Sequence, residues 1–537
     1  MEPRRIVLIA FDSLPLDLLG QMSADRTLII SETPQPGFDW RPLASALDPA
    51  DLDQAVRLLK ELNTLVDESG TPYRSAVRYH GYEPWWFHQQ AAFDEYLAHF
   101  VRYLPLLAAC REAARVIIVD CPYPLRRIFP LIHRRVEMRW RSVKPSRLRR
   151  IRRAASGAFY RIVTAIAIAH ATVRRPPALV YTVDGIDGRG RNRWIDGLYQ
   201  ALRRRNTSFL EIAWSDTGAR ALRRWRVRPR LVAYAQAVAS RDEADPRPDW
   251  PRDATHDGEL VQAFLHSLAR NVLVPAAQRS VRSIRRYESL LRLTRAAGVY
   301  LMDDYVHAFE LVVACRRRGV PTVALQHGQF NRYTAGLMGY GFDGERHHSY
   351  DRYCVWNDYF AQLLVRHSRL VPADSVVVAG SPRARAETRE VTRPRVIECD
   401  RGRANADAGT AREHGSWKLG RPPPPAHVVG PRVLFLAEHY DASSQQEVDA
   451  YERALAVTDI ELWLKTHQST AKQPARAPAY PGREPRAVDA PLDELLARVD
   501  VVVASYSSAI FEAILHMKPG VLFSTSRYRD PHGLAEA

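Results

Sequence analysis

Cysteine is scarce in this sequence, and its few copies show no functional spacing. The five cysteines are spread over 537 residues and include neither a CxxC pair nor a spacing typical of a zinc site. This distribution argues against a disulfide framework and against cysteine-ligated metal, and it fits a reduced, cytoplasmic compartment. The cysteines are Cys110, Cys121, Cys315, Cys354 and Cys399.

Long hydrophobic runs are missing as well. No stretch of about 18 uninterrupted apolar residues occurs, so no membrane-spanning helix is predicted. The best candidate, residues 158–173, is interrupted by Arg161 and His170. The N-terminus has no charged-then-apolar leader, and residues 6–11 instead predict a short buried strand. The chain also lacks a GxSxG motif, a GK[S/T] loop and a metal-triad spacing, which argues against hydrolases and NTPases.

Lysine is rare, although the chain is strongly basic. Six lysines stand against 71 arginines, and the net charge is +17. The densest basic run is Arg134–Arg153, and three interpretations of it are open: a nucleic-acid patch, a contact with anionic lipid headgroups, or a solvated helix in an arginine-rich protein. The lack of a nucleic-acid-binding motif disfavours the first. Each charge near an anionic leaflet gains roughly 1 kcal/mol, which keeps the membrane surface as a candidate partner.

An apolar segment follows this basic run. Residues 155–173 carry side chains that can insert partly into a bilayer, and an apolar segment beside a basic cluster supplies the two signals that stable peripheral binding requires. The alternative is an internal helix that packs on the first sheet. The apolar residues in question are Phe159, Ile162, Val163, Ile166 and Ile168.

Strands alternate with helices of about 10–15 residues along most of the chain, which predicts an α/β fold with mostly parallel sheets. Strands are predicted at 6–11, 27–30, 116–119, 178–183, 209–214, 299–302, 322–326, 353–356, 375–379, 433–437, 460–465, 501–504 and 520–523. Helices are predicted at 194–204, 258–297 with an interruption near Pro275, 306–318, 359–369, 444–456, 492–498 and 508–516.

The composition divides the chain into four parts. Residues 1–150 predict an N-terminal α/β region, and 151–383 predict a Rossmann-like domain. Periodicity is lost over 384–430, where proline, arginine, alanine and glycine are dense, as is typical of a linker. Residues 431–537 predict a second Rossmann-like domain. The chain ends roughly 15 residues after the last predicted strand.

Chemically active residues follow six of the predicted strands. Ligands of open α/β sheets bind beyond the carboxyl ends of the strands, so six such loops together predict a cleft. Two of the loops have simpler explanations, since Asp303–Asp304 can cap the next helix and His327 can be a buried histidine satisfied by the backbone. The loop residues are Asp184, Asp303–Asp304, Gln326–His327–Gly328, His439, Lys465–Thr466–His467 and Ser505 with Ser507–Ser508.

The C-terminal loops have the composition of a phosphate site. Ser507 and Ser508 open the predicted helix 508–516, whose free N–H groups attract anions, although ordinary helix capping explains the same serines. Lys465 and His467 follow the neighbouring strand and can reach the same phosphates. Glu512, one turn into the helix, can reach a ribose hydroxyl.

These motifs resemble a family. A strand followed by Lys465–Thr466–His467, then by Ser507-Ser508-x-x-x-Glu512 and Lys518–Pro519, is similar to bacterial surface-polysaccharide glycosyltransferases of the two-Rossmann-domain GT-B type. The likeness is to the group that contains polysialyltransferases and CDP-glycerol glycerophosphotransferases. Residues 321–328, 351–359 and 380–383 resemble the end of the acceptor-side domain in related capsule and lipopolysaccharide enzymes.

The resemblance implies roles for individual residues. It implies that His467, Ser507, Ser508 and Glu512 bind the donor nucleotide, with Lys465 beside them, and that an acidic residue of the first domain is the base. The family's acidic pair before glycine is incomplete here, because only Asp184 precedes Gly185, with Asp187 just beyond. Asp184, Asp187 and His327 are therefore the candidate bases. Gln468 also stands where the family has proline, and the chain ends before the further helices of the family's fold. The resemblance therefore implies a truncated or a divergent, even inactive, second domain.

The expected function is transfer of a sugar from a nucleotide-sugar donor to a surface polysaccharide or lipid-linked glycan. The nucleotide sugar is a substrate, and we expect neither a cofactor nor a metal, and no nucleic-acid partner. Such an enzyme would work in the cytoplasm, at the inner membrane face. Two alternatives stay open: a phosphoglycerol transferase that uses CDP-glycerol, and a non-catalytic glycan-assembly protein with a degenerate transferase fold.

Overall fold

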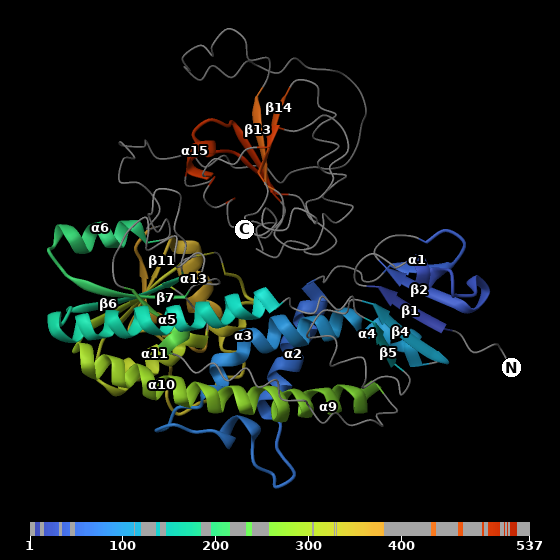
Figure 1. The fold of residues 1–537 in the computed structure, drawn as a ribbon, viewed down its shortest axis with the longest axis horizontal. Coiled ribbons are helices and arrows are strands. Elements are labelled where there is room, and N and C mark those ends of the chain that lie inside the picture. The colour runs from blue at the N-terminus through green and yellow to red at the C-terminus, as the bar shows by residue number, and fades with distance from the viewer. Residues whose placement is uncertain are drawn as a thin grey trace. The chain divides into compact units, whose positions relative to one another are not determined.

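The computed structural model divides the chain into two compact units (Figure 1). The described residues up to 380 belong to the first unit, and those from 431 to 522 belong to the second. The described residues are 6–10, 16–31, 35–42, 49–111, 113–119, 136–139, 147–183, 195–214, 232–238, 257–302, 306–326, 328, 330–380, 431–436, 460–465, 486–487, 492–504, 510, 513 and 516–522.

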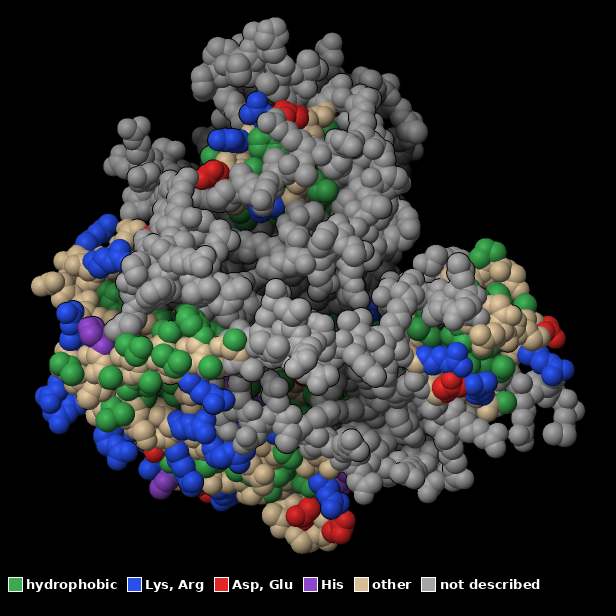
Figure 2. Space-filling view, in the orientation of Figure 1, with side chains coloured by type: hydrophobic (Ala, Val, Ile, Leu, Met, Phe, Trp, Pro, Cys, Tyr) green, Lys and Arg blue, Asp and Glu red, His purple; other side chains and the backbone are tan. Residues whose placement is uncertain are grey.

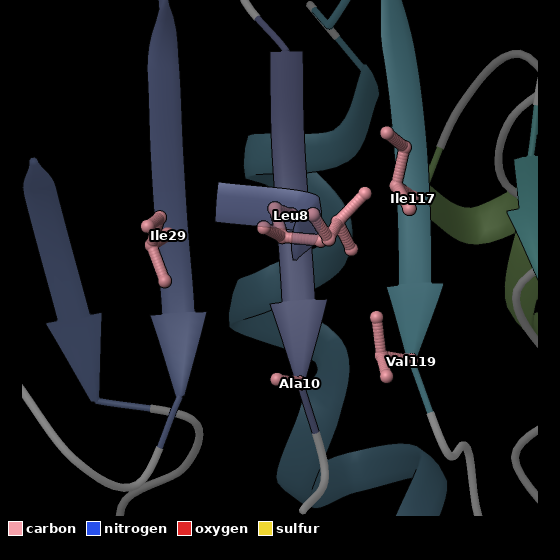
Figure 3. Close-up of a cluster of buried hydrophobic side chains, with 6 residues drawn as sticks. Leu8, Ala10, Ile29, Ile117 and Val119 are labelled. Atoms are coloured by element: carbon pink, nitrogen blue, oxygen red, sulfur yellow. The ribbon is translucent and has the colours of Figure 1, made fainter. Parts of the chain in front are cut away.

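The first unit begins with a five-stranded parallel sheet. Its strand order is β3-β2-β1-β4-β5. The central strands are continuous apolar runs, as expected where both faces of a parallel sheet are covered. Figure 3 shows Leu8, Ile29 and Ile117 side by side on three neighbouring strands. The strands are β1 (Ile6–Ala10), β2 (Thr27–Ser31), β3 (Asp39–Pro42), β4 (Arg115–Val119) and β5 (Val136–Arg139), and the short helix α1 (Leu16–Leu19) follows β1.

The two edge strands of this sheet were not predicted from the sequence, because neither has an apolar run. β5 lies inside the basic run Arg134–Arg153, and its Glu137 pairs with Arg115 on β4 and, at 2.6 Å, with Arg139. The residues from Arg147 onward instead begin the long helix α5 (Arg147–Arg174). The interpretation of Arg134–Arg153 as one solvated helix is therefore wrong: part of the run is an edge strand and part is a helix.

A helical layer over residues 49–111 packs on the central part of the first unit. It is joined there by the buried amide of Asn63, which accepts a hydrogen bond from Trp85 Nε1 (2.7 Å) and donates to the carbonyl of Tyr340 (3.0 Å). Trp85 and Trp86 are among the largest fully buried side chains. The helices are α2 (Pro49–Thr64), η2 (Tyr73–Ala76), η3 (Pro84–His88), α3 (Gln89–Ala92), the π-helical turn η4 (Phe93–Leu97) and α4 (Ala98–Arg111).

The central sheet of the first unit has seven parallel strands, in the order β12-β11-β10-β9-β6-β7-β8. Six of them were predicted to within about two residues, and β8 was not. The strands are β6 (Ala178–Val183), β7 (Phe209–Trp214), β8 (Val232–Tyr234), β9 (Gly298–Leu301), β10 (Thr322–Leu325), β11 (Arg352–Val355) and β12 (Val376–Val378). The helices between them are α6 (Asp196–Arg204), α8 (Ala235–Val238), α11 (Val306–Arg317), α12 (Ala335–Met338) and α13 (Asp358–His367).

The predicted helical region 258–297 is interrupted near Pro275, as expected. Helix α9 (Asp257–Leu268) passes into a π-helical turn, η7 (Ala269–Leu273), and then into α10 (Val274–Thr294). Proline has no N–H to donate, and at the first turn of a helix it removes no hydrogen bond. The wider turn therefore ends where α10 begins, and the two helices run on past the central sheet (Figure 1).

The second unit contains a five-stranded parallel sheet in the order β15-β14-β13-β16-β17. Together with the two sheets of the first unit, it confirms the α/β class with Rossmann-like sheets. The segments 384–430 and 444–456 lie outside the described residues, and the domain boundaries remain predictions. The elements are β13 (Arg432–Leu436), β14 (Glu461–Lys465), β15 (Arg486–Ala487), α15 (Leu492–Leu496), β16 (Val501–Ala504) and β17 (Gly520–Leu522).

The core of the first unit encloses a histidine that burial keeps neutral. His348 is packed against Phe87 and Phe309, with ring centroids 4.9 Å and 5.0 Å away. Burial, with the nearby His347 and Arg316 as further causes, lowers the pKa of His348 to about 3. The unfolded chain binds this proton near its ordinary pKa of 6.5, so stability is complete above that value and falls as the pH drops below it.

We predict that His348→Phe makes the protein less sensitive to acid. Phenylalanine fills the same aromatic site without a proton to bind, so the loss of unfolding free energy between about pH 7 and about pH 5 should shrink by about 2 kcal/mol. Urea unfolding at the two pH values measures this loss. The control is His347→Phe at the exposed neighbouring position. An unchanged pH dependence in His348→Phe would contradict the prediction.

Candidate functional site

One of the eight site residues predicted from the sequence lies within the described part of the chain. Lys465 is the last residue of β14 and is half-buried. The roles of all eight remain predictions, although the strands that precede most of them are described. Outside the described residues lie Asp184, Asp187, His327, His467, Ser507, Ser508 and Glu512.

In the sheet of the second unit, the strands that precede two predicted phosphate-binding segments end at the same edge. Leu436 at the end of β13 pairs with Lys465 on one side and with Ala504 on the other. With neighbouring strands about 4.8 Å apart, Lys465 and Ala504 are separated by about 10 Å. The chain leaves the sheet toward His467 after Lys465 and toward Ser507 after Ala504. The two segments therefore start from one edge, two strands apart.

In the central sheet, Gln326 ties together the loops that follow β10 and β11. Its side-chain oxygen accepts a hydrogen bond from the backbone N–H of Trp356 (2.9 Å), and its Nε2 donates to the carbonyl of Gly328 (2.9 Å). The indole Nε1 of Trp356 donates to the carbonyl of Gln326 (2.8 Å). These bonds hold the backbone on both sides of position 327, where the sequence predicts a candidate base.

The same edge of the central sheet carries a histidine paired with a buried carboxylate. His307 is the second residue of α11, which begins after the loop at the carboxyl end of β9. Its Nδ1 lies 2.8 Å from Oε2 of Glu310, one turn further along the helix. The Glu310 side chain is 3% exposed, while that of His307 is 25% exposed. A carboxylate that accepts the Nδ1 proton leaves the lone pair on Nε2, the state of a general base.

Trp214 fixes the plane of the His307 ring. The indole stacks on the imidazole with ring centroids 4.7 Å apart and an interplanar angle of 25°. Trp214 ends β7 and pairs with Val183, the last residue of β6, while β9 flanks β6 on its other side. His307 therefore lies beside the end of β6, which Asp184 and Asp187 follow along the chain. Among the described residues, Nε2 of His307 has no hydrogen-bond partner.

A buried hydrogen-bond chain supports Glu310 from behind. Ser280 on α10 donates to Glu310 Oε1 (2.6 Å), and Nε2 of His88 lies 3.1 Å from the Ser280 hydroxyl. Burial, with the Arg279 guanidinium as a further cause, lowers the pKa of His88 to about 3, so this imidazole is neutral at physiological pH. The chain thus joins η3, α10 and α11.

Sequence reasoning missed this pair, although a signal was present. His307 and Glu310 are three residues apart on a predicted helix, and that spacing places both on one face. The candidate residues of that loop were instead Asp303–Asp304, which lie outside the described residues. No group of three or more histidine, cysteine or acidic residues in the described part of the chain is arranged to hold a metal ion.

Comparison with known proteins gives only weak structural similarities. No protein-family model matches the sequence, and no curated protein matches it. The chain is similar to the solved glycotransferase of kitacinnamycin, at 14% identity over 67% of this chain and 83% of that chain, with a TM-score of 0.37. It is similar to the UDP-GlcNAc 2-epimerase of Neisseria meningitidis bound to UDP-GlcNAc, at 9% identity over 64% and 81%, with a TM-score of 0.36.

A third similar structure is the glycosyltransferase SnogD from Streptomyces nogalater, at 16% identity over 65% of this chain and 81% of that chain, with a TM-score of 0.33. Identities and TM-scores as low as these carry no argument about the activity or the site residues of this chain. None of the three is described as a polysialyltransferase or a glycerophosphotransferase. The resemblance to that group remains a prediction.

We predict that Gln326→Ala destabilises the first unit. The substitution leaves the buried N–H of Trp356 without its acceptor, and an unsatisfied buried donor costs about 1–3 kcal/mol. Urea unfolding measures the change. Gln362→Ala is the matched control, because Gln362 is exposed on α13. Equal stability of the two variants would show that the Gln326 bonds do not hold the loop.

Proposed function

We propose that this protein is a glycosyltransferase with a nucleotide-sugar donor, and that His307 deprotonates the acceptor hydroxyl. The observation that supports the proposal is the His307–Glu310 pair at the carboxyl edge of the central parallel sheet. Nδ1 of His307 faces a buried carboxylate at 2.8 Å, and the ring is stacked on Trp214. A histidine held in this way is oriented for proton transfer and needs no further reorganisation.

The chemistry assigned to this pair is a single proton transfer coupled to substitution. Nε2 of His307 takes the proton of an acceptor sugar hydroxyl, whose oxygen forms a bond to the anomeric carbon of the donor. The bond from that carbon to the donor phosphate breaks, and the nucleotide leaves with the electron pair. The Glu310 carboxylate compensates the positive charge that develops on the imidazole.

The donor nucleotide is assigned to the second unit. Lys465 stands at the edge from which His467 follows, and Ser507, Ser508 and Glu512 follow the strand two positions away. Positive charge and helix N–H groups stabilise the charge that develops on a leaving phosphate. We assign His467, Ser507 and Ser508 to the phosphates and Glu512 to the ribose.

The acceptor proposed is a surface polysaccharide or a lipid-linked glycan, and the proposed place of action is the cytoplasm. Asp184, Asp187 and His327 are rival candidates for the base. A phosphoglycerol transferase that uses CDP-glycerol would need the same proton transfer, so the identity of the donor separates it from a sugar transferase. A non-catalytic assembly protein would need neither a donor nor a base.

We predict that the protein binds a nucleoside mono- or diphosphate. Calorimetric titration with CMP, CDP, UDP and GDP should give saturable heat with at least one of them. His467→Ala and Ser508→Ala should each weaken that binding by about 1.5–3 kcal/mol, the value of a charge-assisted hydrogen bond. Absence of binding to all four nucleotides would refute the enzymatic proposal and favour the assembly protein.

We predict that His307→Gln lowers kcat by about 100-fold or more, since a positioned general base contributes 10²–10⁴-fold. Nucleotide affinity should not change, because the substitution affects proton transfer and not donor binding. Glu310→Gln, which keeps the shape but removes the charge, should cause a smaller loss of kcat. Turnover is measured as nucleotide release from the donor found by titration, with a glycan acceptor present.

The control for this experiment is His367→Gln, at an exposed position near the end of α13. Asp184→Asn tests the strongest rival in parallel. Full activity in His307→Gln together with a loss in Asp184→Asn would transfer the role of the base to the aspartate and contradict the assignment of His307.

A further inference from the structure

One face of helix α5 is packed into the core of the first unit. Its inner face packs on β7 and β8: Tyr160 contacts Tyr234 with ring centroids 4.8 Å apart, and Thr164 accepts a hydrogen bond from the N–H of Tyr234 (2.8 Å). Phe159 and Val163 are packed against the same cluster. The helix is therefore anchored to the sheet along one side, and these residues are not available for another partner.

The outer face of α5 is a stripe of exposed aliphatic side chains. Ile162 is 60% exposed, Ile166 is 51% exposed and Val173 is 83% exposed. Exposed alanines continue the stripe at helical spacing, at positions 155, 158, 165 and 169. Figure 2 shows hydrophobic side chains gathered on the face where Figure 1 draws α5, with basic side chains beside them. An exposed apolar patch of this kind marks an interaction surface.

The charge along this helix and its flanking sequence has a single sign. Between Glu137 and Asp184 the sequence contains eleven arginines and lysines and no acidic residue. Arg161 and Arg174 on α5 are exposed, as is Arg175 directly after it, and none of them forms an ion pair with a described residue. Seven arginines lie on α5 itself. The partner must therefore accept aliphatic side chains and strong positive charge together.

We propose that the outer face of α5 docks on an anionic membrane surface. A bilayer that contains anionic lipid offers phosphates to the arginines and an acyl region to Ile162, Ile166 and Val173. A second copy of α5 would bring like charges together, which opposes association. A nucleic acid offers phosphates but gives an aliphatic stripe nothing to pack on. Of the described helices, none is long and apolar enough to cross a membrane.

This geometry narrows the set of inserting residues expected from the sequence. Of the five apolar residues named there, Ile162 and Ile166 lie on the outer face, whereas Phe159 and Val163 pack inward. Val173, near the end of the helix, joins the outer face. From position 155 to 173 the stripe is about 27 Å long, since a helix rises about 1.5 Å per residue. Because its inner face is packed on β7 and β8, the helix lies along the membrane surface and does not cross it.

Vesicle flotation of the full chain tests this proposal independently of any enzymatic activity. The protein should float with vesicles of phosphatidylcholine and phosphatidylserine, should not float with phosphatidylcholine alone, and should be released by added salt. The triple variant Ile162→Gln, Ile166→Gln, Val173→Gln should lower the bound fraction at least about tenfold without changing the charge. A second variant, with Arg147, Arg149, Arg150, Arg152 and Arg153 changed to glutamine, should lower it to a similar extent.

The matched control is the double variant Leu293→Gln, Val365→Gln, which removes exposed aliphatic side chains from α10 and α13. It should float like the parent protein. The proposal is overturned by equal flotation with neutral and anionic vesicles, by flotation with neither, or by unchanged binding in the triple variant. Salt-sensitive retention on a nucleic acid with no vesicle binding would also overturn it, because the arginines would then serve a different partner.

Discussion

The buried carboxylate of Glu310 links three segments of the first unit. Glu310 is 2% exposed, and a buried carboxylate is stable only when its oxygens are hydrogen-bonded. One oxygen accepts a hydrogen bond from Ser280 on α10, and the other pairs with Nδ1 of His307 on its own helix. The ring of His88, in η3, lies within hydrogen-bonding distance of Ser280. Satisfying Glu310 therefore requires three segments of the chain to be in place together. His307 gains a defined ring orientation from the same requirement, so folding and the geometry of the proposed base depend on one interaction.

The chemistry proposed for the two units depends on one structural principle. In a parallel sheet all carboxyl ends lie at one edge, and the loops that follow them meet there. In the central sheet this edge carries His307, Trp214 and the Gln326 loop. In the second unit the register aligns Lys465 with Ala504 across β13. The proposal of a transferase assigns proton transfer to the first edge and the donor phosphates to the second, and each assignment is tested separately.

Helix α5 illustrates how an internal helix can also present a surface. A helix that packs on a sheet buries about one face, and the opposite face is ordinarily polar. On α5 the exposed face also carries large aliphatic side chains, and the helix has seven arginines and no acidic residue. Tyr160 and Thr164 pack one face of the helix on β7 and β8, and Ile162 and Ile166 on the opposite face are exposed to solvent. The inner face therefore makes the segment an internal helix, packed on the central sheet and not on the first one, while insertion of the outer face into a membrane remains a proposal.

The sequence alone determined the class of fold, because the central strands of a parallel sheet are continuous apolar runs and helices with a period of 3.6 separate them. Strands such as β1, β9 and β16 could be read directly. The edge strands β3 and β5 could not, because they lack that run and are stabilised by pairing with a neighbour. The His307–Glu310 pair was visible as a spacing, but its significance depends on burial and on Ser280 and His88, which lie 30 and 192 residues from their partners. Tertiary structure alone decided which carboxylate is desolvated and which face of α5 meets solvent, because both depend on packing between segments far apart in the chain.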